Sequence, residues 1–145
     1  NRLFGRLISS LGAFLVERGD NDSAAIRLAI DILKEGRTLL VFPEGTRGDG
    51  VTMGEVKAGI AMLAKRSAAV VVPVGIAGSH KMMPRGGKGI RRAKVTVVYG
   101  KPLRFSDFES VEGDPRIAFT EALVSEMHRA CAEGGLELAP FRSAN

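Results

Sequence analysis

The sequence predicts an α/β fold, a mostly parallel mixed sheet with crossover helices, in a single domain over residues 1–145. Two observations predict it. Apolar runs of strand length alternate along the chain with segments whose apolar residues recur at helical spacing. The runs Thr38–Phe42 and Ala69–Gly78 are almost continuously apolar, as strands covered on both faces are. The chain shows neither an internal repeat nor a second domain, so one sheet is expected.

The expected elements follow one another in a regular order. They are a helix over residues 3–11, a strand over 13–17, a helix between 22 and 36, a strand over 38–42, a helix over 55–67, strands over 69–78 and 93–100, and a helix over 115–133. Asp114 before Pro115 is typical of an N-cap followed by proline at the first helical position. Gly36 stands where a left-handed C-cap residue is favoured. Pro73 removes a ladder donor, so it indicates an edge, a bulge or a strand end.

Composition narrows the function without deciding it. The formal net charge of +5 suits an anionic partner, which could be nucleic acid, a phospholipid surface or a phosphorylated substrate. Cys131 is the single cysteine, which excludes an internal disulfide. No run of 18 apolar residues occurs, so no membrane-spanning segment is predicted. No metal site is expected, because two histidines and one cysteine, with His80 far from the other two in the sequence, do not build a recognisable zinc site. Phosphate-loop, dinucleotide-binding and nucleophile-elbow motifs are absent as well.

The connection over residues 79–92, "SHKMMPRGGKGIRR", matches neither a strand nor a convincing helix. A loop of that length in a compact domain tends to be functional or disordered. It contains no acidic residue and five basic ones: Lys81, Arg85, Lys88, Arg91 and Arg92. Two interpretations stay open, a solvated basic loop and a contact with an anionic head group or membrane surface.

The most informative stretch is "TLLVFPEGTRGDG", residues 38–50. Ligands of open α/β sheets bind outside the carboxyl ends of the strands, and "PEGTR" directly follows such an end. Pro43 ends the hydrogen-bond ladder, and Gly45 permits a tight or left-handed turn. Arg47 then offers a planar guanidinium that matches phosphate or carboxylate bidentately.

Three neighbours complete this anion site. Thr46 adds a hydroxyl, and Glu44 can orient the arginine or accept a hydrogen bond from a substrate. Lys57 follows on the first turns of the next expected helix. The alternative, a β-turn with an incidental surface ion pair, stays open on spacing alone.

"VFPEGTR" resembles the third conserved block of the glycerophospholipid acyltransferase family, whose best-known members acylate lysophosphatidic acid to phosphatidic acid. Further blocks occur in the family's order over roughly residues 1–105. They are "GAFLVER" at 12–18, "VKAGIAMLA" at 56–64, "VVPVGIAG" at 71–78 and "KVTVVYGKPL" at 94–103. The resemblance implies a glycerolipid-acyltransferase-like sheet. It also implies transfer of a fatty acyl group, in phospholipid biosynthesis, to a glycerophosphate hydroxyl.

The resemblance also implies roles for individual residues. Arg18 and the loop Glu44, Gly45, Thr46 and Arg47 would hold the acceptor's phosphate and glycerol, with Lys57 assisting. Val72 and Pro73 would lie near the path of the acyl donor. The donor would be acyl-CoA or acyl carrier protein, and no cofactor is expected.

The family's catalytic pair is a histidine and an aspartate at H-x-x-x-x-D spacing, and the histidine acts as general base on the acceptor hydroxyl. That block should precede Gly12, but no histidine occurs before His80. Neither His80 nor His128 is followed by an aspartate at that spacing. We therefore expect the pair upstream of Asn1, no catalytic residue among these 145, and no acyl transfer by this chain alone.

The expected partners are a lysophospholipid, an acyl thioester, acyl carrier protein and an anionic membrane surface. The expected location is the cytoplasmic face of a membrane, peripheral or anchored by a segment outside this chain. Two alternatives stay open: a non-catalytic module that binds anionic membranes, and an acyltransferase that uses glycerol 3-phosphate or another lysophospholipid. A nucleic-acid binder is disfavoured, because no aromatic residues are interleaved with the basic loop.

Overall fold

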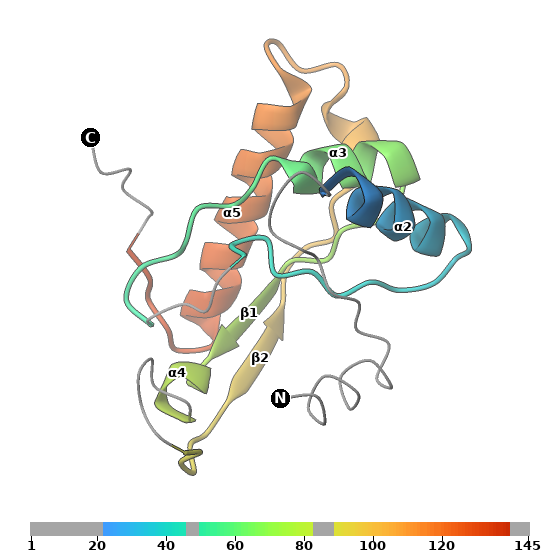
Figure 1. The fold of residues 1–145 in the computed structure, drawn as a ribbon. Helices are drawn as coiled ribbons and strands as arrows, with labels where there is room; N and C mark the ends of the chain where they lie inside the picture. Colours follow the sequence, from blue (N-terminus) through green and yellow to red (C-terminus); the bar gives the residue numbers. More distant parts are fainter. Residues whose placement is uncertain (1–21, 46–49, 83–88, 140–145) are drawn as a thin grey trace.

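A computed structural model describes residues 22–45, 50–82 and 89–139 of the chain. The elements within these ranges are α2 (Asp22–Lys34), α3 (Gly59–Ser67), β1 (Val74–Ala77), α4 (Ser79–Met82), β2 (Thr96–Tyr99), the 3₁₀ helix η1 (Phe105–Phe108) and α5 (Pro115–Glu133). Figure 1 shows α5 running along one side of the β1–β2 pair. Helices α2 and α3 lie at one end of the molecule and α4 lies at the other. The α/β class predicted from the sequence is confirmed.

Strands β1 and β2 form an antiparallel pair, in which Val74 is opposite Tyr99 and Ala77 is opposite Thr96. The pairing extends beyond the strands, because Val71 and Leu103 exchange two backbone hydrogen bonds of 2.9 and 2.8 Å. Helix α5 packs closely on β1. A Cβ atom on Gly75 would lie 2.5 Å from the backbone of Ala130 and Cys131, so only glycine allows this approach.

One element of the predicted sheet is wrong. Residues 38–42 were expected to form a buried strand, but they form no strand, and Leu40 and Phe42 are 73% and 64% exposed. An apolar run becomes a buried strand only where neighbouring strands satisfy its backbone groups and elements packed on the faces of the sheet cover its side chains. Within the described ranges no strand pairs with this run, and the sheet has two antiparallel strands instead of a mostly parallel arrangement. The elements expected over residues 3–11 and 13–17 lie outside the described residues.

The other elements agree with the sequence except at their ends. Helix α3 begins at Gly59, and the four residues before it have an irregular backbone, although the helix was expected from Glu55. The one-turn helix α4 falls in the connection over residues 79–92, where no helix was predicted. Helix α5 begins as expected, because Asp114 is its N-cap and the carboxylate accepts a 2.8 Å hydrogen bond from the backbone N–H of Arg116.

The core has two clusters. The larger joins α3, η1 and α5 and includes Met53, Ala61, Ala64, Phe105, Phe119, Leu123 and Met127. Phe119 is fully buried at its centre, with the rings of Phe105 and Phe108 both 5.5 Å away. The smaller cluster packs Ala29 and Ile30 of α2 against Leu63 of α3. Met53 belongs to the larger cluster, so the segment that follows the candidate site is anchored in the core.

Candidate functional site

The candidate site begins with a turn at the end of the apolar run. The backbone N–H of Gly45 donates a 3.0 Å hydrogen bond to the carbonyl oxygen of Phe42. Gly45 has a φ of +64°, in the left-handed region that its position in the sequence predicted. The turn therefore places Glu44 at its corner, directly before the residues predicted to grip an anion.

The carboxylate of Glu44 accepts a 2.6 Å hydrogen bond from the backbone N–H of Gly54. This bond closes the segment between residues 44 and 54 into a loop whose two ends are held together. A Cβ atom on Gly54 would lie 2.7 Å from the carboxylate oxygen, so a larger residue would displace it. One oxygen of Glu44 is thus committed to the backbone of Gly54.

Sequence reasoning missed Gly54 as part of this site. Gly54 is absent from the glycines with positive φ, so no turn requirement explains it. An isolated glycine that no turn demands can indicate a close approach by another group. The sequence shows only that position 54 is glycine; that no turn demands it is known from the structure.

Lys57 lies beside the same turn, but not on the first turns of a helix as expected, because α3 begins only at Gly59. Its backbone N–H donates a 3.0 Å hydrogen bond to the carbonyl oxygen of Pro43, next to Glu44. Its ammonium forms an ion pair with Glu55, and the lysine side chain is 64% exposed. An exposed pair of this kind is worth little, so the ammonium is available to an anionic ligand at small cost.

Of the remaining predicted site residues, the structure describes only Val72 and Pro73. Arg18, Thr46 and Arg47 lie outside the described residues. Val72 is 44% exposed, whereas the next residue, Pro73, is buried and its carbonyl oxygen accepts a 2.8 Å hydrogen bond from the N–H of Gly100. Of the two residues proposed for the donor path, Val72 offers the accessible side chain.

His80 packs against the far end of the loop, a contact that the sequence did not reveal. A Cβ atom on Gly50 would lie 2.5–2.7 Å from three atoms of the imidazole of His80. Of the described residues on either side of positions 46–49, Glu44 is bonded to Gly54 and Gly50 lies against the ring of His80. This contact gives His80 a packing role beside the site.

The pKa of the Cys131 thiol is influenced by the charge of Glu44 in this turn. Burial raises the pKa of the thiol above its ordinary value, and the negative charge of Glu44 raises it further. The backbone of Ile76 lowers this pKa in part, through a hydrogen bond. The Cys131 thiol is thus neutral at physiological pH and is a poor candidate for a nucleophile.

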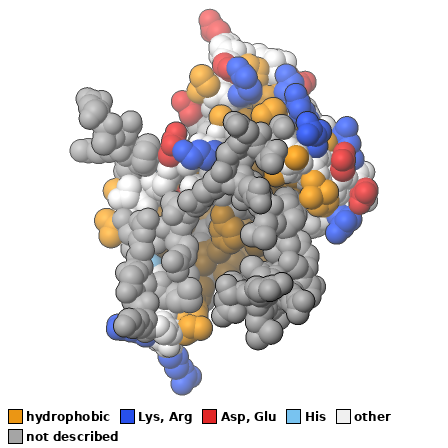
Figure 2. All heavy atoms as spheres, in the orientation of Figure 1, with side chains coloured by type: hydrophobic (Ala, Val, Ile, Leu, Met, Phe, Trp, Pro, Cys, Tyr) orange, Lys and Arg blue, Asp and Glu red, His pale blue; other side chains and the backbone are white. Residues whose placement is uncertain are grey.

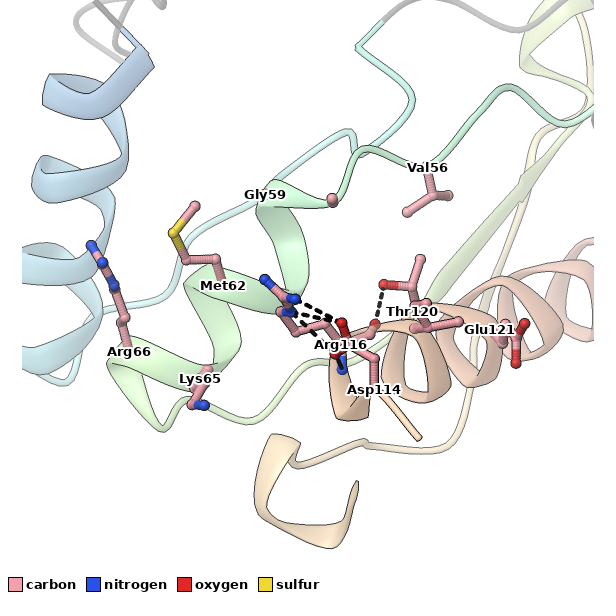
Figure 3. A pocket seen from close by; sticks show the side chains of 11 residues that line it. Val56, Gly59, Met62, Lys65, Arg66, Asp114, Arg116, Thr120 and Glu121 are labelled. Carbon is pink, nitrogen blue, oxygen red and sulfur yellow. Dashed lines mark hydrogen bonds and ion pairs between the residues drawn. The ribbon is translucent and has the colours of Figure 1, made fainter. Parts of the chain in front are cut away.

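Two hollows lie along α5. The smaller, about 230 Å³, is next to the site, because Met53, Gly54 and His128 line it. The larger, about 970 Å³, lies between α3 and the start of α5, and Figure 3 shows Met62, Arg116 and Thr120 around it. Arg116 is paired with Asp114 there, at 2.7 Å. Val56 and Thr120 line both hollows, so the two adjoin each other.

The described residues supply neither a metal centre nor a membrane span. No group of three or more His, Cys, Asp and Glu side chains within them could hold a metal ion. None of the helices in the described ranges combines the length and the apolar character that crossing a bilayer requires.

Comparison with known proteins identifies the class. A family model described as Acyltransferase matches residues 1–77, a range that contains the Glu44 turn, Gly54 and Lys57. This match covers more than half of the chain. The chain therefore belongs to the acyltransferase family, as its sequence blocks predicted.

Three individual members of this family illustrate the similarity. The chain is 31% identical over 131 residues to a 1-acyl-sn-glycerol-3-phosphate acyltransferase of Streptococcus pneumoniae, covering 89% of this chain and 46% of the relative. It is 32% identical over 126 residues to the enzyme of that name from Bacillus subtilis, covering 85% of this chain and 59% of the relative. A chloroplastic 1-acyl-sn-glycerol-3-phosphate acyltransferase of Arabidopsis thaliana is 29% identical over 124 residues, with 83% and 35% covered. The chain thus spans between about a third and three fifths of these relatives.

A solved structure agrees. The 1-acyl-sn-glycerophosphate (LPA) acyltransferase PlsC from Thermotoga maritima matches with a TM-score of 0.58 and 32% sequence identity. The match covers 72% of this chain and 44% of the other. Fold and sequence therefore indicate the same family.

Proposed function

We propose that this chain is part of an O-acyltransferase that moves a fatty acyl group from an acyl thioester to lysophosphatidic acid, giving phosphatidic acid. The observation that carries the proposal is the Glu44 turn, held by Gly54 and flanked by Lys57, within the range that the acyltransferase model matches. The printed names of the relatives, which are 1-acyl-sn-glycerol-3-phosphate acyltransferases, supply the substrate class.

The proposed chemistry is attack of the acceptor's free hydroxyl on the thioester carbonyl. The C–O bond of the new ester forms, the C–S bond breaks, and the hydroxyl proton passes through the general base to the departing thiolate. The resemblance assigns the base to a histidine of an H-x-x-x-x-D block, which these 145 residues do not contain. The role proposed for this chain is to hold the acceptor in position for that attack.

The proposed acceptor grip follows from the chemistry of the loop. Arg47 would bind the phosphate with two parallel hydrogen bonds, with Thr46 and Arg18 as further donors. Glu44 would keep the loop in shape through its bond to Gly54, and Lys57 would add a positive charge at the turn. The exposed side chain of Val72 would lie on the donor's path. No cofactor is needed for this transfer.

The partners and location are part of the same proposal. The donor would be acyl-CoA or acyl carrier protein. Both the acceptor and the product would reside in a bilayer, so we place the protein at the cytoplasmic face of a membrane, where it is either peripheral or anchored. The net charge of +5 supports association with an anionic surface.

Replacement of Arg47 in the complete protein tests the proposal. Arg47→Lys should lower kcat/KM for lysophosphatidic acid about 10- to 100-fold, because an ammonium cannot reproduce two parallel hydrogen bonds. Steady-state assays with lysophosphatidic acid and an acyl thioester measure this. Arg37→Lys is the matched control, because Arg37 is exposed and pairs only weakly, at 3.5 Å, with Glu35.

Two outcomes would contradict the proposal. The first is an unchanged kcat and KM in the Arg47→Lys protein. The second is efficient acylation of glycerol 3-phosphate or another lysophospholipid with little use of lysophosphatidic acid, which would assign a different acceptor to the same site.

A further inference from the structure

The described parts of the connection between β1 and β2 are residues 78–82 and 89–95. The chain leaves β1 through Gly78, whose φ is +87° and where a Cβ atom would collide with the carbonyl oxygen of Lys94. The chain then turns through α4 and returns toward β2. The backbone N–H of Arg91 donates a 2.9 Å hydrogen bond to the carbonyl oxygen of Met82, which ties the returning arm to α4. Figure 1 shows these residues at one end of the molecule, at the foot of the β1–β2 pair.

This end is basic and unneutralised. We call Lys81, Ile90, Arg91, Arg92 and Lys94 the basic tip. Its four cationic residues are exposed, and none of the ion pairs recorded among the described residues involves them. The sequence contains no Asp or Glu between Glu55 and Asp107. Figure 2 shows Lys and Arg side chains projecting from this end without a neighbouring acidic side chain.

An apolar side chain stands among these cations. Ile90 is 76% exposed, the highest value among the exposed large hydrophobic side chains of the described residues. Gly89 before it has a φ of +87°. Exposure of an isoleucine beside Arg91 and Arg92 is unfavourable in water, but it suits an interface with acyl chains below and anionic head groups around it.

We infer that the basic tip docks on the surface of a bilayer that contains anionic lipids, with Ile90 inserted among the acyl chains and the four cations at the head groups. The inference rests on the proposed function in one respect: that function places the acceptor in a bilayer. Nucleic acid would also attract the cations. It would gain nothing from Ile90, and no Phe, Tyr or Trp occurs between Phe42 and Tyr99 to stack on bases.

Vesicle co-sedimentation of the 145-residue chain tests the inference. The chain should bind phosphatidylcholine vesicles that contain phosphatidylglycerol, should leave pure phosphatidylcholine vesicles in the supernatant, and should dissociate as salt rises. Because each cation near an anionic surface contributes about fivefold in affinity, Arg91→Ala with Arg92→Ala should weaken binding roughly 25-fold. Ile90→Asn should weaken it roughly three- to tenfold through lost apolar burial.

Two control variants test whether binding depends on the basic tip itself or only on the protein's net charge and exposed apolar side chains. Lys65→Ala with Arg66→Ala removes two adjacent cations from α3, at the other end of the molecule. Ile117→Asn changes an isoleucine of α5 that is 59% exposed. Both controls should retain vesicle binding within about twofold of the parent chain.

Equal losses of vesicle binding in the tip variants and the control variants would overturn the inference, because the net charge of the protein would then explain binding. Binding to a single-stranded oligonucleotide that is as tight as vesicle binding and insensitive to Ile90→Asn would overturn it too. No acyl donor or acceptor is present in the assay. Failure of docking is therefore distinguishable from failure of the proposed acyl transfer, which Arg47→Lys tests in the complete protein.

Discussion

The carboxylate of Glu44 is bound to the protein's own backbone, through the 2.6 Å hydrogen bond from Gly54. A hydrogen bond to a charged acceptor is among the stronger ones, and here it joins two positions ten residues apart. The acidic residue of the "PEGTR" stretch is therefore joined to Gly54, and these two described positions lie on either side of residues 46–49.

Gly54→Ala should open this loop. The added methyl would lie 2.7 Å from the Glu44 carboxylate, so the hydrogen bond must lengthen or break. We expect the free energy of unfolding to fall by about 1–3 kcal/mol, and lysophosphatidic acid use by the complete protein to fall with it. Urea denaturation and steady-state kinetics measure the two effects.

Gly59→Ala is the matched control for that substitution. A Cβ atom on Gly59 would meet nothing within 4 Å, and alanine favours the helix that begins there. The control should be as stable as the native chain or more so. A Gly54→Ala protein that matched the control in stability and kinetics would contradict the role given to the Glu44–Gly54 bond.

Helix α5 organises the fold, because it packs on β1 and η1 and supplies Phe119, Leu123 and Met127 to the core. Its first turn depends on Asp114, which caps the helix and pairs with Arg116 at 2.7 Å. These hydrogen bonds hold the pKa of the Asp114 carboxyl at about 2, below its ordinary 3.8. A stable start to α5 keeps the hollow next to Gly54 in shape, since Thr120 and His128 line it.

Asp114→Ala should therefore lower stability in a pH-dependent way. The folded-state pKa is depressed, so the stabilisation is fully present above the ordinary pKa and is lost as pH falls toward about 2. The gap in urea midpoint between the native chain and the variant should be largest near neutral pH and should shrink in acid. Asp31→Ala, which removes a charge from the last turn of α2, away from any helix N-terminus, should cost less at neutral pH. A gap that stayed constant down to pH ~2 would refute this account of the cap.

Features that depend on nearby residues could be read from the sequence. The start of α5 at Asp114 and Pro115 and the left-handed turn at Gly45 were predicted and are confirmed. Each rests on local chemistry, such as a cap or a positive φ. The family was likewise predicted from local blocks and is confirmed.

Features that depend on distant partners could not be read in the same way. The run over residues 38–42 is apolar enough for a buried strand, but its state depends on neighbours that lie elsewhere in the chain. The antiparallel pairing of β1 with β2, the bond from Gly54 to Glu44 and the packing of His80 on Gly50 also join separated segments. Periodicity carries no information about such pairs.

The molecule as a whole separates its proposed tasks in space. The Glu44 turn and Lys57 form the proposed acceptor grip, and the basic tip at the foot of the β1–β2 pair would meet the bilayer. Helix α4, at that end, also carries His80, whose ring packs on Gly50 at the end of the loop. The proposed membrane contact and the proposed acceptor loop are thus connected by direct packing.

The central claim is that this chain binds the phosphate of a lysophospholipid. Amide chemical-shift mapping of the isotope-labelled chain tests it most directly. A short-chain lysophosphatidic acid should shift the amide resonances of Gly45, Gly54 and Lys57, whereas the matching monoacylglycerol, which lacks the phosphate, should leave them in place. Arg47→Lys should weaken the response and Arg37→Lys should not. Equal shifts with both ligands, or shifts confined to the basic tip, would contradict the claim.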